Sequence, residues 1–358
     1  MKKVLKIVII ILIVIVAVIV SYAAYLFISY HRDGDKVLEV GGDAQLSGID
    51  RGDSNGFTVV SFNIGFGAYE SDFGFFMDGG NRARAWSEER LDKNMKKIAN
   101  LLAEQDADIY LVQEIDTDAM RTYHVDERKY LTDVLTERDN VYAQNFDSAY
   151  LFYPFIEPHG TAKSGIIMFS RFDITKAERV ELPVETGVMK IVDLDRCYSK
   201  SRIKVSDGKE LIVYNFHLSA YTSDGRITND QLKKLLSDMQ YEYDKGNYCL
   251  AGGDFNKDLL GDSSVYFGKS DKTYTWAQPI PDGMFDGFTV KLYAPLDEDD
   301  PVPTNRNADS AYHEGQFVVT IDGFLMTDNL SFVSSSVINT NFAYSDHNPV
   351  KMTFKFAD

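Results

Sequence analysis

The chain has 358 residues, 54 of them acidic and 37 basic, which gives a formal net charge of −17. So acidic a surface repels polyanions at long range, which argues against sequence-independent binding of DNA unless a basic cleft or divalent cations offset the repulsion. Two cysteines in a chain of this length exclude a fold organised by disulfides, and Cys249, in an apolar run, is expected to be a buried thiol.

The first thirty residues predict a membrane anchor. Residues 7–30 carry no charge and are long enough to cross a bilayer, and Lys2, Lys3 and Lys6 precede them. The positive-inside rule therefore places the N-terminus in the cytoplasm and the rest of the chain, with a formal charge of −20, outside the cell membrane. A cleaved signal peptide is the alternative, but the apolar run is longer than a usual signal core and its small-residue cleavage site is poor.

The remainder divides into a tether and one domain. Residues 31–56 are rich in Gly, Asp and Ser without periodicity, which predicts a flexible tether. Residues 57–358 show no repeat and no second linker, so we expect a single α/β domain. Apolar spacing predicts helices over 87–105, with Ser87 as N-cap, and over 228–246. Strands are expected in the segments 58–65, 107–116, 164–171, 210–218, 248–254, 316–324 and 348–356.

Polar residues end most of these strands, where the apolar pattern does not require them. Such residues suggest a site along one rim of a sheet. Any single one of them is more simply a polar turn; the whole set, with these residue types, is not. The set comprises Asn63, Glu114, Ser170, His217, Asp254, Asn256 and Asp322, and Asp346 and His347 stand just before the last strand.

Oxygen donors dominate this set, and no cysteine belongs to it. Such ligands suit a hard cation, Mg²⁺ or Mn²⁺, whereas zinc would want more His or Cys at close spacing. In the sequence GGDFN, Asp254 and Asn256 are two residues apart and face the same way in an extended segment. The paired glycines before them allow close approach of another backbone or of a substrate.

Seven short motifs, in order, resemble the endonuclease/exonuclease/phosphatase superfamily over residues 57–356. The resemblance implies a four-layer α/β sandwich, two stacked mixed β-sheets flanked by helices, and divalent-metal hydrolysis of a phosphate ester. The motifs are SFN (61–63), VQE (112–114), SGIIMFSR (164–171), NFHL (215–218), GGDFN (252–256), IDGF (321–324) and SDHNPV (345–350).

The resemblance also implies the metal ligands. Glu114 resembles the principal metal-binding carboxylate, Asn63 a residue beside it at the metal or the phosphate, and Asp346 a second carboxylate on the metal side.

The remaining roles concern the reaction. Asp254 resembles the residue that orients or deprotonates the attacking water, although a role as metal ligand stays open, and Asn256 one that positions water or phosphate. His217 and His347 resemble phosphate contacts, and Asp322 resembles the acid that orients His347. Asp346 and His347 are neighbours whose side chains should point to opposite sides, so we do not expect them to pair.

The substrate is less well defined by the sequence. Residues 66–86 are rich in aromatic side chains, which suits either a substrate- or membrane-contacting loop or a self-packed cover of the core. We favour a phosphodiester of a lipid headgroup or a small phosphate ester, hydrolysed outside the membrane. An extracellular endonuclease or exonuclease is the alternative, which a positive cleft around Arg82, Arg84, Lys163 and Arg202 would favour; an inactive surface binding module is the third. We infer no obligate protein partner.

Overall fold

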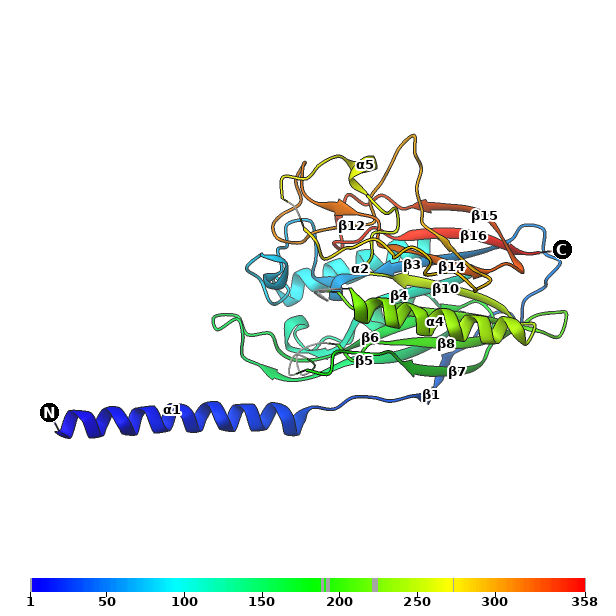
Figure 1. The fold of residues 1–358 in the computed structure, drawn as a ribbon. Helices are drawn as coiled ribbons and strands as arrows, with labels where there is room; N and C mark the ends of the chain where they lie inside the picture. The colour runs from blue at the N-terminus through cyan, green and yellow to red at the C-terminus, as the bar shows by residue number, and fades with distance from the viewer. Residues whose placement is uncertain (1, 188–189, 191–193, 221–224, 273, 358) are drawn as a thin grey trace.

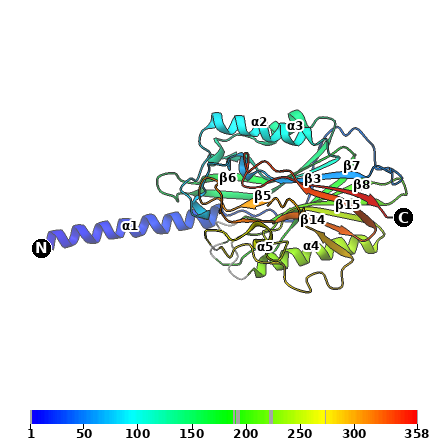
Figure 2. The ribbon, with the colours of Figure 1, turned by 90° about the horizontal axis from the view of Figure 1, so that it is seen from above.

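Two β-sheets stacked face to face form the body of the protein, with helices on both outer faces (Figures 1 and 2). The computed structural model describes residues 2–187, 190, 194–220, 225–272 and 274–357. Helices α2 and α3 cover one sheet and α4 covers the other, which gives four layers. The predicted α/β sandwich is therefore confirmed.

The helices and strands run as follows. The α-helices are α1 (Lys2–Ser29), α2 (Glu88–Glu104), α3 (Arg128–Val134), α4 (Arg226–Asp244) and α5 (Ser264–Phe267). Single 3-10 turns are η1 (Gly65–Gly67), η2 (Phe76–Asp78) and η3 (Met120–Thr122). The strands are β1 (Lys36–Leu38), β2 (Val40–Gly42), β3 (Phe57–Asn63), β4 (Ile109–Ala119), β5 (Asp139–Leu151), β6 (Gly160–Ser170), β7 (Ile174–Glu181), β8 (Cys197–Lys204), β9 (Glu210–His217), β10 (Tyr248–Asp254), β11 (Val290–Tyr293), β12 (Asn305–Arg306), β13 (Val318–Val319), β14 (Asp322–Thr327), β15 (Leu330–Val337) and β16 (Val350–Phe356).

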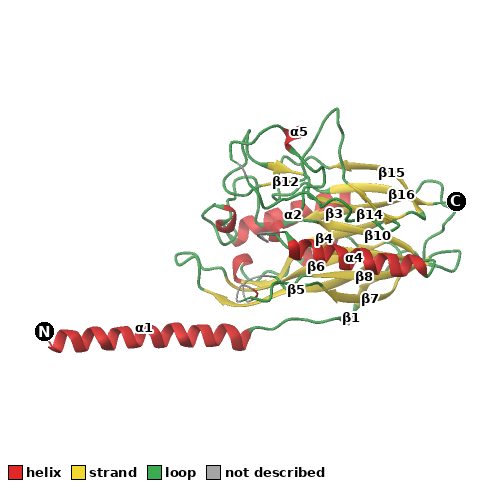
Figure 3. Ribbon diagram, viewed as in Figure 1, coloured by secondary structure: helices red, strands yellow, loops and turns green. Residues whose placement is uncertain are grey.

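Each large sheet has seven strands and one central parallel pair. One sheet has the order β1-β7-β8-β9-β10-β14-β11, with β9 and β10 parallel. The other has the order β15-β16-β3-β4-β6-β5-β2, with β3 and β4 parallel. The carboxyl ends of both pairs lie at the same end of the sandwich, where loops also gather, on the side from which α1 extends (Figure 3). Polar side chains at these strand ends are therefore brought together.

Apolar side chains fill the three interfaces between the layers. Residues such as Leu111, Met168 and Val213 form the core between the sheets. The helix predicted over 87–105 is α2, and its cap is as expected, because the Ser87 hydroxyl accepts a hydrogen bond from Arg90 N. Leu91 and the apolar residues that follow it at helical spacing pack on the sheet that contains β3 and β4. The helix predicted over 228–246 is α4, which begins two residues earlier and ends two residues earlier.

Part of the expected tether is structured. Residues 36–42 form the two edge strands β1 and β2, which pair with β7 and β5 and so extend both sheets. The low periodicity of so short a segment hid this pairing, because edge strands of three residues need no apolar alternation. The segment is therefore anchored to the domain rather than flexible along its whole length.

Helix α1 projects from the body and has no buried residue (Figure 1). Its length and composition are those of a helix that could cross a membrane, and it is the one such helix in the described part of the chain. The same features also occur in N-terminal signal sequences.

Candidate active site

The two parallel pairs place four of the predicted residues at one rim. Asn63 ends β3, His217 ends β9 and Asp254 ends β10, while Glu114 lies in β4 next to Asn63. Strand β14 runs antiparallel to β10, so its first residue, Asp322, lies opposite Asp254. The prediction that Asp322 ends a strand was wrong, but the antiparallel direction brings it to the site.

Ser170 does not belong to this rim. Strand β6 runs antiparallel to β4, and Ser170 pairs with Ile109 at the beginning of β4. Its carboxyl end therefore lies at the opposite edge of the sheet. The sequence pattern could not reveal the direction of β6, whereas Ser164, near the start of the same strand, lines the site.

A local irregularity turns Glu114 toward the site. The pairing of β4 with β6 shifts register between Val112 and Ile115, and Glu114 has a φ of 57°, in the left-handed region. An extra residue in one strand of a pair turns a side chain away from its regular direction. Non-glycine residues with positive φ cost about 1–3 kcal/mol and concentrate at functional sites.

The glycines of GGDFN are required by close packing. A Cβ on Gly253 would lie 2.0 Å from the carbonyl oxygen of Phe216, and a Cβ on Gly252 would lie 2.7 Å from Leu111 Cδ1. Strand β10 therefore approaches β9 and the opposite sheet more closely than any larger residue permits, which confirms the expected role of the pair and holds Asp254 in place.

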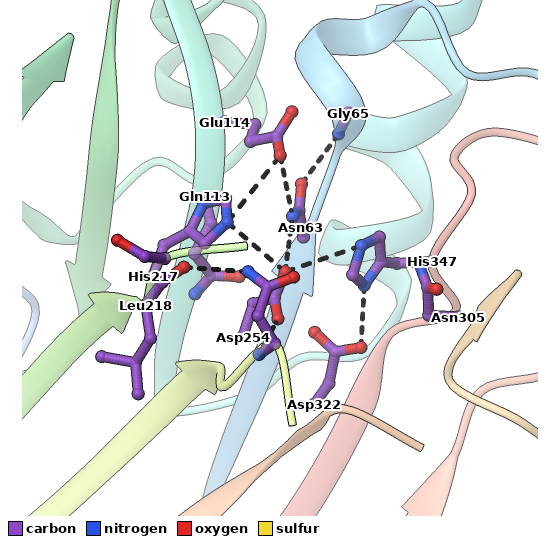
Figure 4. A network of polar contacts seen from close by, with 12 residues as sticks. Asn63, Gly65, Gln113, Glu114, His217, Leu218, Asp254, Asn305, Asp322 and His347 are labelled. Carbon is purple, nitrogen blue, oxygen red and sulfur yellow. Dashed lines mark hydrogen bonds and ion pairs between the residues drawn. The ribbon is translucent and has the colours of Figure 1, made fainter. Parts of the chain in front are cut away.

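One amide joins the two principal carboxylates (Figure 4). Asn63 Nδ2 donates to Glu114 Oε1 and to Asp254 Oδ2, both at 3.1 Å, and its Oδ1 accepts from Gly65 N at 3.0 Å. Asp254 Oδ1 also accepts from Asn256 N at 2.8 Å. The side chain of Asn256 is used elsewhere, because its Nδ2 donates to Leu218 O. In this structure Asn63 thus orients both carboxylates.

Two histidines flank Asp254. Their Nε2 atoms lie 3.5 Å (His217) and 3.7 Å (His347) from Asp254 Oδ2. His347 Nδ1 lies 2.8 Å from Asp322 Oδ2, which is the expected pairing (Figure 4). Asp346 lines the same pocket beside Glu114.

Burial makes the two histidines different. Burial, reinforced by the positive charge of Arg196, holds the pKa of His217 well below its usual range, so this ring is neutral. Burial also disfavours the charged form of His347, but Asp322 and the other nearby carboxylates outweigh it and raise the pKa to about 10. His347 is therefore an imidazolium, with Nε2–H directed at the centre of the site.

The acids at the centre are short of compensating charge. Burial raises the pKa of Asp254, with Asp322 adding to the effect and His347 opposing it. Burial likewise raises the pKa of Asp346 to about 6. Clustered carboxylates whose burial is not balanced by the cations of the chain are typical of functional sites.

Six of these residues form one wall of a pocket of about 440 Å³, a volume in the range of small-molecule sites: Glu114, His217, Asp254, Asn256, Asp346 and His347. The opposite wall is largely apolar. It is built by the loop after Asn63, by the hairpin between β5 and β6, and by the C-terminal turns of α1; its side chains include Phe66, Tyr69, Phe75, Phe76, Met77, Leu151, Phe152, Tyr153, Tyr22 and Leu26.

The loop 66–86 is mostly a self-packed cover. Phe66, Tyr69, Phe73 and Phe75 are buried in the core beneath α2. Of its aromatic and large apolar residues, Met77 and Trp86 remain exposed. The self-packed alternative is therefore confirmed for most of the loop, although its inner rings also line the pocket.

The four basic residues named from the sequence do not form a positive cleft. Arg82 pairs with Glu157 at 2.9 Å, and Arg84 donates to the Pro158 carbonyl. Lys163 lies 3.9 Å from Asp147, and Arg202 pairs with two glutamates beneath α4. None of the four lines the pocket.

Three other arginines line it instead, and sequence reasoning missed them. Arg121 is held by Asp116 and stacks on Phe66, and Arg306 donates to backbone carbonyls. Arg196 is buried, and its Nε and Nη1 have no hydrogen-bond partner among the described residues. No motif or spacing marks any of the three, because tertiary packing alone brings them together.

The donor set fits a divalent cation. Glu114, Asp254 and Asp346 present carboxylate oxygens to one pocket, the ligands that Mg²⁺ and Mn²⁺ prefer. A second possible set of ligands is Asp254, Asp322 and His347. Each offers one oxygen or nitrogen atom, and these three atoms lie within 4.8 Å of one another, close enough to share an ion. In this second set His347 Nδ1 is already bonded to Asp322 Oδ2, so the ring could offer an ion only Nε2, and only when that nitrogen carries no proton.

Comparison with solved structures agrees with this fold. The structure resembles an endonuclease/exonuclease/phosphatase from Beutenbergia cavernae at 16% identity, over 84% of this chain and 72% of that chain, with a TM-score of 0.56. It resembles ANGEL2, described as a 2′,3′-cyclic phosphatase, at 16% identity over 89% and 98%, with a TM-score of 0.54, and the catalytic domain of human Nocturnin at 16% identity over 89% and 98%, with a TM-score of 0.52.

At these identities the likeness establishes the fold alone. No curated protein sequence matches the chain. The model of the Endonuclease/Exonuclease/phosphatase family, however, matches residues 60–347, which include every catalytic and metal-binding residue predicted from the sequence. The chain therefore belongs to the Endonuclease/Exonuclease/phosphatase family.

Proposed function

We propose that the protein is a membrane-anchored phosphoesterase that uses Mg²⁺ or Mn²⁺ to hydrolyse a phosphodiester outside the cell membrane. The observation that carries this proposal is the position of Asp254, which lies between the amide of Asn63 and the Nε2 atoms of two histidines. Family membership supports hydrolysis of a phosphate ester, and the buried, oxygen-rich donor set supports the cation.

Orientation and deprotonation of the attacking water are assigned to Asp254. Its Oδ2 is oriented by Asn63 and its Oδ1 by Asn256 N, so the carboxylate cannot rotate freely. As the water oxygen bonds to phosphorus, Asp254 accepts a proton from it and the bond to the leaving ester oxygen breaks. A role of Asp254 as metal ligand is the alternative for the same atom.

Stabilisation of the negative charge that develops on the phosphoryl oxygens in the transition state is assigned to the histidines and to the cation. Asp322 fixes the ring of His347, so that Nε2–H points at a phosphoryl oxygen on the Asp254 side of the pocket. His217 contributes a neutral ring on the other side. A divalent cation held by Glu114, with Asp346, would polarise the phosphate and favour ionisation of the water.

The pocket favours a lipid headgroup or a small phosphate ester over nucleic acid. Its outer wall is apolar, the basic residues named from the sequence are paired elsewhere, and the chain carries a net charge of −17. Single-strand binding by stacking on aromatic rings keeps a nuclease as the second candidate, because Phe76 and Trp276 also line the pocket.

The test uses the purified full-length chain in nanodiscs. We expect hydrolysis of bis-p-nitrophenyl phosphate with Mg²⁺ or Mn²⁺, loss of that activity with chelator, and recovery on adding the metal back. The Asp254→Asn variant should be inactive and the matched control Asp230→Asn, an exposed aspartate of α4, fully active. Activity that survives chelation would contradict the mechanism.

A substrate panel then separates the candidates. Sphingomyelin, phosphatidylinositol phosphates, DNA and RNA are compared side by side at equal phosphate concentration. Faster turnover of a phospholipid supports the proposal, and faster turnover of DNA or RNA replaces it with the nuclease. If the protein binds the metal and compounds of this panel but cleaves none of the esters, the inactive binding module is the remaining possibility.

A further inference from the structure

The hairpin between β5 and β6 carries the most exposed apolar surface of the domain. Residues 149–156 read AYLFYPFI and contain no charge. Phe155 is 75% exposed and Ile156 fully exposed, and Phe152 and Tyr153 are exposed beside them. A contiguous apolar surface of this kind on a folded domain marks an interaction site.

The hairpin lies against α1. Tyr22 Oη donates to Tyr150 O at 2.9 Å, and Tyr150 N donates to Tyr25 Oη at 3.0 Å. The rings of Tyr22 and Phe152 meet edge to face at 4.8 Å. Both ribbon views show the hairpin extending beside the C-terminal turns of α1, beyond the body of the domain (Figures 1 and 2).

This contact sets the depth of the hairpin if α1 crosses a membrane. About 20 residues span the hydrocarbon core, and a count from the last lysine of the N-terminal cluster, Lys6, reaches Leu26. Tyr22 and Tyr25 then lie in the last turn and a half of this span, next to the outer interface that tyrosine side chains prefer. Because the hairpin is bonded to these two residues, its tip lies at that same depth.

Charge at the base of the hairpin is compensated. Glu157, the first acid after the apolar stretch, pairs with Arg82 at 2.9 Å and accepts from Ala83 N at 2.8 Å. The carboxylate therefore does not oppose contact with an anionic or zwitterionic headgroup layer.

The hairpin also leads directly to the catalytic residues. Tyr22, Leu26 and Phe152 line the same pocket as Asp254 and His347. A molecule that enters the pocket along the faces of these three side chains would thus reach the reacting groups without leaving the interface.

We propose that the tip of this hairpin, residues 152–156, docks into the outer leaflet of the membrane that holds α1, and that it thereby opens the pocket onto the layer of lipid headgroups. The inference rests on the anchor of the proposed function, and it names the substrate class as a membrane lipid with a phosphodiester headgroup. Phe155 and Ile156 are its insertion residues, and they do not line the pocket.

The first test measures depth and needs no activity. Both native cysteines are buried, so Ile156→Cys gives one accessible thiol for an environment-sensitive fluorophore in the full chain, and Val265→Cys, another exposed apolar position, gives the control. In nanodiscs holding a single chain, we expect quenching by brominated lipids at 156 only. Equal quenching of both labels by aqueous iodide would overturn the proposal. That result would overturn it even if a second copy of the chain were found to cover the tip in concentrated solution.

The second test separates docking from catalysis. The double variant Phe155→Ser, Ile156→Ser should lower turnover of a phospholipid in vesicles about tenfold or more, because two apolar side chains no longer enter the leaflet. Turnover of soluble bis-p-nitrophenyl phosphate should stay within about twofold, because neither residue touches the pocket. An equal loss on both substrates would overturn docking, whereas absence of both activities in the unmodified protein would count against the proposed function instead.

Discussion

Two buried clusters of charged residues lie on opposite sides of the sheet that contains β8 and β10, and they differ in how their charges are balanced. In one, Glu242 of α4 accepts from Lys200 Nζ at 2.8 Å and from Arg202 Nη2 at 2.6 Å. Burial alone would raise its pKa, but these hydrogen bonds outweigh burial and lower the pKa of Glu242 to about 2. In the other cluster the pKa values of Asp254 and Asp346 are raised.

The difference separates a structural site from a chemical one. The Glu242 cluster satisfies each charge within the chain and leaves nothing for a ligand. The Asp254 cluster leaves buried carboxylates with raised pKa values, as is typical of functional sites, and under the proposed function a cation and an anionic substrate would complete it. Three experiments test this difference between the two clusters.

The largest effect is expected for Asp254→Asn. Loss of the group assigned to the attacking water should lower kcat by about a thousandfold or more. Stability should stay the same or rise, since one uncompensated buried charge is removed. Steady-state kinetics and urea unfolding of the same preparation check both parts. A variant that kept a tenth of the activity would show that Asp254 is not essential.

A smaller and opposite effect is expected for Glu242→Gln. Three cations, Lys200, Arg202 and the more exposed Lys245, lose a shared buried partner, so the free energy of unfolding should fall by about 3 kcal/mol. Activity should stay within about twofold, because Glu242 lies on the inner face of α4 and does not line the pocket. The matched control is Glu210→Gln, the more exposed partner of Arg202, with an expected loss under about 1 kcal/mol. Equal losses in both variants would contradict the contrast.

The smallest effect is expected for the stability of the protein at acidic pH. The pKa of Glu242 lies below its ordinary value of 4.5, so in the folded state it binds fewer protons than in the unfolded chain. Its contribution is therefore present above about pH 4.5 and is lost as the pH falls toward 2. The stability difference between the unmodified protein and Glu242→Gln should shrink over that interval in urea titrations. A difference that stayed constant would argue against an ionised Glu242.

The sequence was most informative where apolar strands end in chemically unusual residues. Asn63, His217 and Asp254 fell where expected, because parallel strands bring their carboxyl ends to one edge. The direction of antiparallel strands was not accessible, which is why Ser170 was misplaced and why Asp322 was assigned to the wrong end of its strand.

Other features depend on tertiary contacts. Strands β7 and β15 escaped detection because much of their surface is exposed and polar, so they lack a continuous apolar run. Arg196 carries no local signal, since only the packing of the domain brings it to the pocket. The segment 149–156 has an apolar composition that a buried strand would also show, and only its exposure distinguishes the two.

The amide of Asn63 has one more consequence. It belongs to one sheet and holds Asp254 of the other, and the pairing of His347 with Asp322 crosses the same divide. The reacting groups are therefore in register only while the two sheets are docked. Turnover would then report on the relative position of the two sheets. If one sheet shifted against the other with every strand intact, activity would be lost before spectroscopy detected any unfolding.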